Sequence, residues 1–169
     1  GFRGRWAEGR EQKPEFRVGP AATLNDVERV ETSLGHALPS AFREVVLEYS
    51  SSISVLWQIP DELEPPKEFK RIFAGECRWD LLALPALVAE HKAWITNCFS
   101  NPDEDYDKVW HGKLPFLQVG NGDMIAIDPL QPGEPVVYLS HDDGEGHGYR
   151  LGDNFIDYVD RLVRIGCPG

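Results

Sequence analysis

The densest group of possible metal ligands and acid–base side chains lies in residues 141–147. Two histidines and three carboxylates fall in this stretch: His141, Asp142, Asp143, Glu145 and His147. Imidazole nitrogens and carboxylate oxygens can bind Zn²⁺ or Ca²⁺. The spacing fits neither an EF-hand loop, which needs alternating ligands and a distal glutamate, nor a structural zinc site, which usually includes cysteine. We therefore predict a polar loop after a strand, with no metal and no other cofactor.

Nucleophilic catalysis would need Cys98 or Ser140 beside a histidine. Cys98 could meet His91 or His141, and Ser140 precedes His141 directly, but neighbours in sequence do not make a catalytic triad. The chain has no Gly-x-Ser-x-Gly elbow. Cys98 lies at helical spacing from Trp94, which is typical of a small buried hydrophobic residue. We predict no catalytic residues and a protein that is not an enzyme.

The nearest approach to a phosphate-binding loop is Gly-Asn-Gly-Asp at residues 120–123. A phosphate loop needs a Lys-Ser/Thr pair and the start of a helix, and an aspartate would repel the phosphate. Asn-Gly instead supplies the positive φ angles that a tight turn requires. We predict a turn between two strands of a β-hairpin.

The strongest signal in the composition is negative charge. The chain has 17 basic and 28 acidic side chains, which gives a formal charge of −11. Residues 101–160 hold thirteen acidic and three basic side chains, a net charge of −10. This charge repels phosphate backbones and anionic lipids, so we expect no direct binding to nucleic acid or membranes. A basic protein would be attracted.

Acidic side chains gather in two segments, 103–110 and 142–145, and the first of these also contains the aromatic residues Tyr106 and Trp110. Mixtures of aromatic anchors and charged groups are typical of protein interfaces. The alternative is that acidic loops only keep the domain soluble. The residues that we predict to bind a partner are Asp103, Glu104, Asp105, Tyr106, Asp107, Trp110, Asp142, Asp143 and Glu145.

Length and cysteine usage place these segments on one domain in a reducing compartment. A chain of 169 residues with 41% hydrophobic residues is long enough for one core. The three cysteines are odd in number, widely spaced and without a Cys-x-x-Cys pair, which argues against disulfides. No apolar stretch reaches ~18 residues, and residues 1–20 lack the apolar core of a signal peptide. We expect a cytoplasmic protein.

The predicted helices begin after an irregular arm, residues 1–20, and belong to a single domain, residues 21–169. The first helix spans residues 23–35, where Thr23 and Asp26 resemble a capping box and Gly35 suits a left-handed C-cap. A second helix carries Phe42, and Pro85 opens a third. The last begins near Asp153 and ends at residue 166.

The predicted strands lie between these helices. Their ranges are 53–59, 114–119, 124–128 and 135–140, with weaker candidates at 69–73 and 76–79. Proline and acidic residues at 60–66 indicate a loop, as does the segment 101–105. Helices, an antiparallel meander and a closing helix predict an α+β fold, with helices on one face of an antiparallel sheet.

Several short motifs in this order are similar to those of a known family. They are the helix at 23–35, Gly-His-Ala-Leu-Pro at 35–39, Leu-Pro-Phe at 114–116, the turn at 120–123, Val-Val-Tyr at 136–138 and the late helix with Phe155. Together they resemble the SUKH superfamily, which includes fungal Smi/Knr-type regulators of cell-wall synthesis and many bacterial proteins. The resemblance covers roughly residues 23–165. The chain departs from the family in its Arg-rich arm and in its segments 60–66 and 101–107.

The resemblance implies an α+β domain that acts by binding another protein. Bacterial members are widely interpreted as immunity proteins that neutralise polymorphic toxins, many of them nucleases. We therefore expect an immunity protein that blocks a basic toxin domain by stoichiometric occlusion, with carboxylates standing in for phosphates. The alternatives are a Smi/Knr-like regulatory or scaffolding protein and, from another class, a metal- or small-molecule-dependent enzyme.

Overall fold

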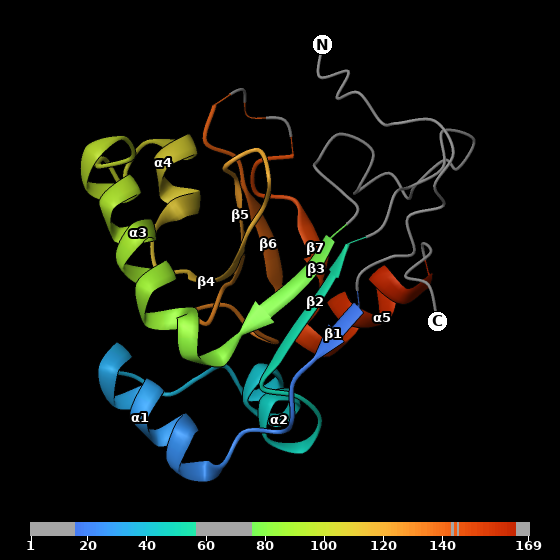
Figure 1. Ribbon diagram of the computed structural model, residues 1–169. Helices are drawn as coiled ribbons and strands as arrows, with labels where there is room; N and C mark the ends of the chain where they lie inside the picture. The colour runs from blue at the N-terminus through green and yellow to red at the C-terminus, as the bar shows by residue number, and fades with distance from the viewer. Residues whose placement is uncertain (1–15, 57–75, 143, 145, 165–169) are drawn as a thin grey trace, which may run out of the picture.

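The computed structural model describes residues 16–56, 76–142, 144 and 146–164 (Figure 1). Within these residues the strands form two antiparallel sheets, in the orders β1-β2-β3 and β4-β5-β6-β7, and five α-helices pack around them. The predicted α+β class is confirmed. The strands divide between two sheets, however, and two α-helices separate β3 from β4 along the chain.

The first two helices have the boundaries that local sequence signals indicate. Helix α1 spans Leu24–Leu34, and Thr23 and Asp26 form the predicted capping box. Gly35 ends the helix with a φ of 80°, a left-handed conformation that glycine adopts without steric cost. Helix α2 spans Ser40–Glu48 and buries Phe42.

The three-stranded sheet consists of β1 (Phe16–Val18), β2 (Ser52–Leu56) and β3 (Glu76–Asp80). Residues 16–18 fall in the segment predicted as an irregular arm, but they pair with β2. The Nε1 atom of Trp79 donates a hydrogen bond to the carbonyl oxygen of Ser50 at 3.1 Å. The rest of the predicted arm, the predicted strand at 69–73 and the loop at 60–66 lie outside the described residues.

The four-stranded sheet is a meander of β4 (Leu114–Gln118), β5 (Met124–Ile127), β6 (Val136–Leu139) and β7 (Arg150–Gly152). The predicted turn joins β4 to β5, and Gly122 has a φ of 100° there. Strand β7 was not predicted from the sequence. It has only three residues, and its pairing with β6 is irregular.

The other helices flank this meander in Figure 1. Helix α3 (Leu84–Asn97) packs on β4, and α5 (Phe155–Arg164) packs on β7. Asn154, one residue after the predicted position, caps α5: its Oδ1 accepts a hydrogen bond from the Asp157 backbone. Helix α4 (Asp105–Trp110) was not predicted, and it begins at the last residue of the predicted loop 101–105.

Both faces of the four-stranded sheet are buried. Ile125 and Ile127 belong to a large apolar cluster that also contains Phe42 and Phe155. Because side chains alternate along a strand, Met124 and Ala126 of the same strand face the other way. They belong to a smaller cluster, which consists of Phe99, Trp110, Met124, Ala126, Val137 and Leu139. The smaller cluster was not anticipated, since an antiparallel sheet commonly leaves one face in water.

Candidate protein-binding surface

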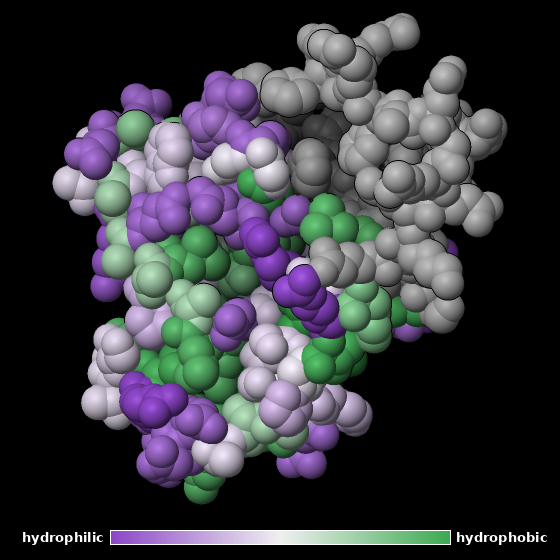
Figure 2. Space-filling model, in the orientation of Figure 1, coloured by the Kyte–Doolittle hydropathy of each residue, from purple (hydrophilic) through white to green (hydrophobic). Residues whose placement is uncertain are grey.

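The first predicted acidic segment forms the start of α4 and the turn before it. Asp103, Glu104 and Asp105 are exposed, and Asp107 is half-buried. The turn is held by Asn101, whose Oδ1 accepts a hydrogen bond from the Asp103 backbone and whose backbone N–H donates to Asp107 Oδ2 at 3.0 Å. Figure 2 shows hydrophilic residues gathered over the part of the molecule where α4 lies. Three of the four carboxylates therefore face solvent.

Trp110, at the other end of α4, is fully buried. Its ring stacks on Phe99 with centroids 4.4 Å apart and an interplanar angle of 12°. A side chain with no exposed surface cannot touch a partner while the helix stays in place. Trp110 therefore differs from the predicted surface anchor, and it holds α4 against the sheet.

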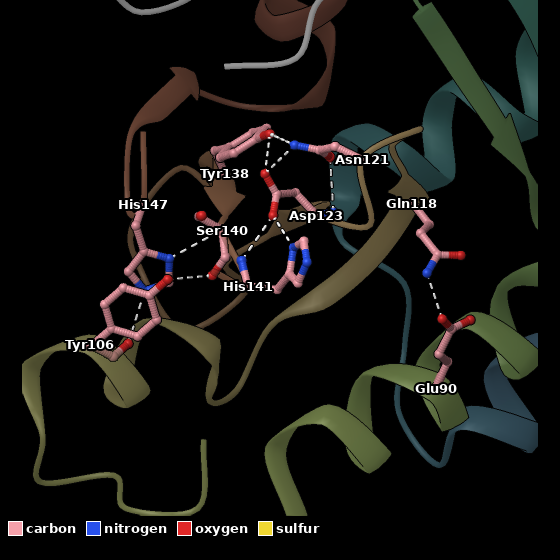
Figure 3. A network of polar contacts seen from close by, with 9 residues as sticks. All are labelled: Glu90, Tyr106, Gln118, Asn121, Asp123, Tyr138, Ser140, His141 and His147. Atoms are coloured by element: carbon pink, nitrogen blue, oxygen red, sulfur yellow. Dashed lines mark hydrogen bonds and ion pairs between the residues drawn. The ribbon is translucent and has the colours of Figure 1, made fainter. Parts of the chain in front are cut away.

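Tyr106 and His147 connect α4 to the second acidic segment (Figure 3). Tyr106 donates a hydrogen bond from its hydroxyl to the carbonyl oxygen of Ser140 at 2.8 Å. His147 Nε2 lies 2.9 Å from the Tyr106 carbonyl oxygen, and the two rings stack with centroids 3.9 Å apart. The structure therefore brings together two segments that are 32 or more residues apart in the sequence. In the second segment Asp142 is exposed, whereas Asp143 and Glu145 lie outside the described residues.

Asp123 joins the hairpin turn to the same loop, a role that was not predicted. Its Oδ1 accepts hydrogen bonds from the backbone N–H and Nδ1 of His141 at 2.8 and 2.6 Å. Its Oδ2 accepts from Tyr138 and from Asn121. Burial raises the pKa of Asp123, but these hydrogen bonds outweigh burial and hold the pKa below its ordinary value. The carboxylate is therefore ionised at neutral pH and fixes the start of the loop.

One group of side chains within the described residues has the proximity of a metal site. Ligand atoms of Asp123, His141 and Asp142 lie within 4.8 Å of one another. The Asp123 oxygens and His141 Nδ1 already hydrogen-bond to each other and to neighbouring donors. A cation would have to compete with those hydrogen bonds, so the donor set fits a structural network better than a metal centre.

The two possible nucleophiles, Cys98 and Ser140, differ in their exposure to solvent. Cys98 was expected to be buried, but it is exposed at the end of α3, and Phe99 takes the buried position. Cys98 lines a shallow hollow of about 230 Å³ with Trp94, Asn97 and neighbouring residues of α3. Ser140 is fully buried. A substrate therefore cannot reach the Ser140 hydroxyl in this conformation.

The sequence contained partial signals for the connecting residues. Asn121 Oδ1 accepts a hydrogen bond from the Asp123 backbone, a local arrangement that Asn-x-Asp sequences favour. Tyr106, Val109 and Trp110 follow helical spacing, which indicates α4. His147 had no local signal for this role, because its hydrogen-bond partners in Ser140 and Tyr106 lie 7 and 41 residues away in the sequence.

Comparisons with known proteins agree with this architecture. No helix among the described residues combines the length and apolar character needed to cross a membrane. No curated protein matches the chain. The family model described as "SMI1 / KNR4 family (SUKH-1)" matches residues 21–161, which is most of the chain and includes both acidic segments. The protein is therefore a member of the SMI1/KNR4 family (SUKH-1).

Proposed function

We propose that this protein is an immunity protein that binds a basic toxin domain through an acidic surface formed by α4, the turn before it and the loop between β6 and β7. We define this acidic surface by Asp103, Glu104, Asp105, Asp107 and Asp142. The observation that carries the proposal is the connection between its two segments, made by Tyr106 and His147. Charges that only kept a domain soluble would not need to be held together in this way.

The charge of the surface supports a basic partner. Residues 101–160 carry a net charge of −10, and the exposed carboxylates of this surface come from that region. Complementary charge accelerates the encounter of two proteins and selects against partners of the same sign. Carboxylates can also occupy the positions that phosphates take in the cleft of a nuclease. Binding there would occlude the toxin.

The rigid support beneath the surface favours binding without large rearrangement. Trp110 anchors α4 in the smaller cluster, and Asp123 fixes the start of the loop through His141. A surface that is ordered before binding loses less conformational entropy on association. Membership of the SMI1/KNR4 family (SUKH-1) also supports this reading, since an immunity or Smi/Knr-like role fits that family.

The test is calorimetric measurement of binding to any toxin domain encoded beside the gene, after that domain has been purified. The triple variant Asp103→Asn, Glu104→Gln, Asp105→Asn removes three charges from the surface. We expect its affinity to fall about tenfold or more, with a weaker salt dependence. The matched control is Glu28→Gln, Glu44→Gln, Glu48→Gln, which removes three exposed charges from α1 and α2. Equal losses in both variants, or no binding by the native protein, would refute the proposal.

A Smi/Knr-like regulatory role is the second candidate, and the family match favours it as well. A regulator would dock on a larger cellular assembly and would not form a one-to-one complex with a toxin. Capture of the tagged protein from its own cells, followed by mass spectrometry at two salt concentrations, separates the two roles. A single basic toxin in the eluate supports immunity, and a multi-subunit housekeeping complex supports regulation.

A further inference from the structure

The loop between β6 and β7 contacts α4 through two side chains, the Tyr106 hydroxyl and the His147 ring. Residues 141–149 include three glycines with positive φ, at 144, 146 and 148. Backbone hydrogen bonds close the base of the loop, for example from Gly148 N–H to the Tyr138 carbonyl at 2.8 Å. The side chain of His147 adds a hydrogen bond to the other side of the loop and another to α4.

The two partners of the His147 ring fix its protonation state. Nδ1 lies 3.0 Å from the backbone N–H of Ser140, which can only donate, so Nδ1 must be an unprotonated acceptor. Nε2 lies 2.9 Å from the carbonyl oxygen of Tyr106, which can only accept, so Nε2 must carry the proton. The neutral ring with its proton on Nε2 satisfies both contacts. A proton on Nδ1 would place two N–H groups against each other.

We propose that His147 is a pH-sensitive clasp between α4 and the described residues of the β6–β7 loop, 140–142, 144 and 146–148. The clasp holds these residues against α4 while the ring is neutral and loosens them when Nδ1 is protonated. The clasp is a property of the free protein and does not depend on the toxin-binding proposal. Acidification would therefore remove one of the two side-chain links between the segments of the acidic surface and leave the Tyr106 hydroxyl as the other. Because Ser140 is fully buried, its N–H cannot simply turn to water when Nδ1 becomes protonated.

The groups around the ring shift the pKa of His147 in opposite directions. Burial disfavours the imidazolium and is the largest effect, whereas the Tyr106 carbonyl and the carboxylates of Asp123 and Asp107 favour it. The net result is a pKa of His147 below its ordinary value. The ring is therefore neutral at pH 7, and the clasp is closed. It opens as the pH falls below 6.5 towards that lowered pKa.

The test follows the ring and the loop separately by NMR in ¹⁵N-labelled protein between about pH 7.5 and about pH 4.5. At the upper pH we expect the proton on Nε2 and a protected Ser140 amide. As His147 titrates, exchange of the Ser140 amide, corrected for its intrinsic pH dependence, should accelerate about tenfold or more. The Val46 amide in α2 should keep its protection, which distinguishes local release from unfolding of the domain.

A non-titrating variant supplies the control. In His147→Gln, protection of the Ser140 amide should no longer change over this pH range. In His36→Gln, which alters an exposed histidine on the linker after α1, the native pH dependence should remain. The proposal is overturned by a neutral ring with its proton on Nδ1. It is also overturned by a Ser140 amide that stays protected after His147 has titrated. Both results come from the native protein, so they hold even where a variant fails to fold.

Discussion

The carboxylate of Glu134 caps the N-terminus of α2 from the other half of the chain. Its Oε2 accepts hydrogen bonds from the backbone N–H and the hydroxyl of Ser40, at 2.7 and 2.6 Å, across a sequence separation of 94 residues. Pro39, at the N-cap position, provides no side-chain acceptor. Glu134 holds a φ of 55°, which residues other than glycine rarely adopt. The turn between β5 and β6 therefore combines an unfavourable backbone conformation at Glu134 with the capping of a helix that is distant in the sequence.

Removing this cap should destabilise the domain. We expect Glu134→Ala to lower the free energy of unfolding by about 1 kcal/mol, the usual effect of losing an N-cap acceptor. Glu134→Gln keeps an acceptor oxygen and should lose less. Urea denaturation at neutral pH measures both, with Glu48→Ala at the far end of α2 as the control. The capping role is wrong if Glu134→Ala unfolds at the same urea concentration as the native protein.

The hydroxyl of Tyr106 can be tested without removing its ring. Tyr106→Phe keeps the stack on His147 but loses the hydrogen bond to the Ser140 carbonyl. We expect a loss of about 1 kcal/mol in stability and faster exchange of amides in the loop. Tyr149→Phe, which removes a hydroxyl from an exposed tyrosine near the end of the same loop, should have little effect. Equal behaviour of the two variants would show that the Tyr106 hydroxyl does not hold the loop.

Among the acidic residues near the acidic surface, Asp123 should be the one whose substitution lowers the free energy of unfolding most. Asp123→Asn removes a charge that four donor groups share, and we expect a loss of about 2 kcal/mol or more at pH 7. The pKa of Asp123 is lowered in the folded protein, so its contribution is present above 3.8 and is lost as the pH falls through the folded value. Thermal unfolding measures both effects. Asp142→Asn, at an exposed position, should stay within about 0.5 kcal/mol of the native protein.

His91 should make the domain sensitive to acid in a different pH range. It is buried in α3 and stacks on Trp110, and its Nε2 has no hydrogen-bond partner among the described residues. Burial lowers its pKa from 6.5 to about 4. The folded state thus takes up a proton less readily than the unfolded chain, and stability falls as the pH drops from 6.5 to about 4. The shift corresponds to about 3 kcal/mol.

The variant His91→Phe keeps an aromatic ring in the cluster and removes the titration. Its free energy of unfolding should change less between about pH 6.5 and about pH 4 than that of the native protein. His147 contributes in the same direction, so the difference between variant and native protein is the relevant measure. His36→Phe, at an exposed position, should retain the native pH dependence. An unchanged slope in His91→Phe would show that His91 does not cause the acid sensitivity.

Segments with strong local signals were predicted well from the sequence. The capping box of Thr23 and Asp26, the left-handed Gly35 and the turn at 120–123 all depend on contacts within a few residues. The strands around that turn and the strand before Ser140 were also recognised, since alternation and flanking turns mark them. These features identified the α+β class and the family.

Features that depend on distant partners were not predictable in the same way. Helix α4 has six residues and an acidic start, which is typical of a loop, and it is held in place by burial of Trp110. The exposure of Cys98 follows from where α3 ends, which its spacing to Trp94 did not reveal. The roles of Asp123 and His147 arise from contacts across 15 to 41 residues.

Because both faces of the four-stranded sheet are buried, one apolar cluster can maintain the fold while the other positions α4. The large cluster joins α1, α2, α5 and both sheets, whereas the smaller one lies beneath α4, next to the acidic surface. Substitutions in the smaller cluster can therefore tilt or shift α4 while the larger cluster maintains the fold. Homologues that face different partners should accordingly diverge most around the positions of Phe99, Trp110 and Val137. Under the proposed function, substitutions selected by a changing toxin partner would accumulate at these positions.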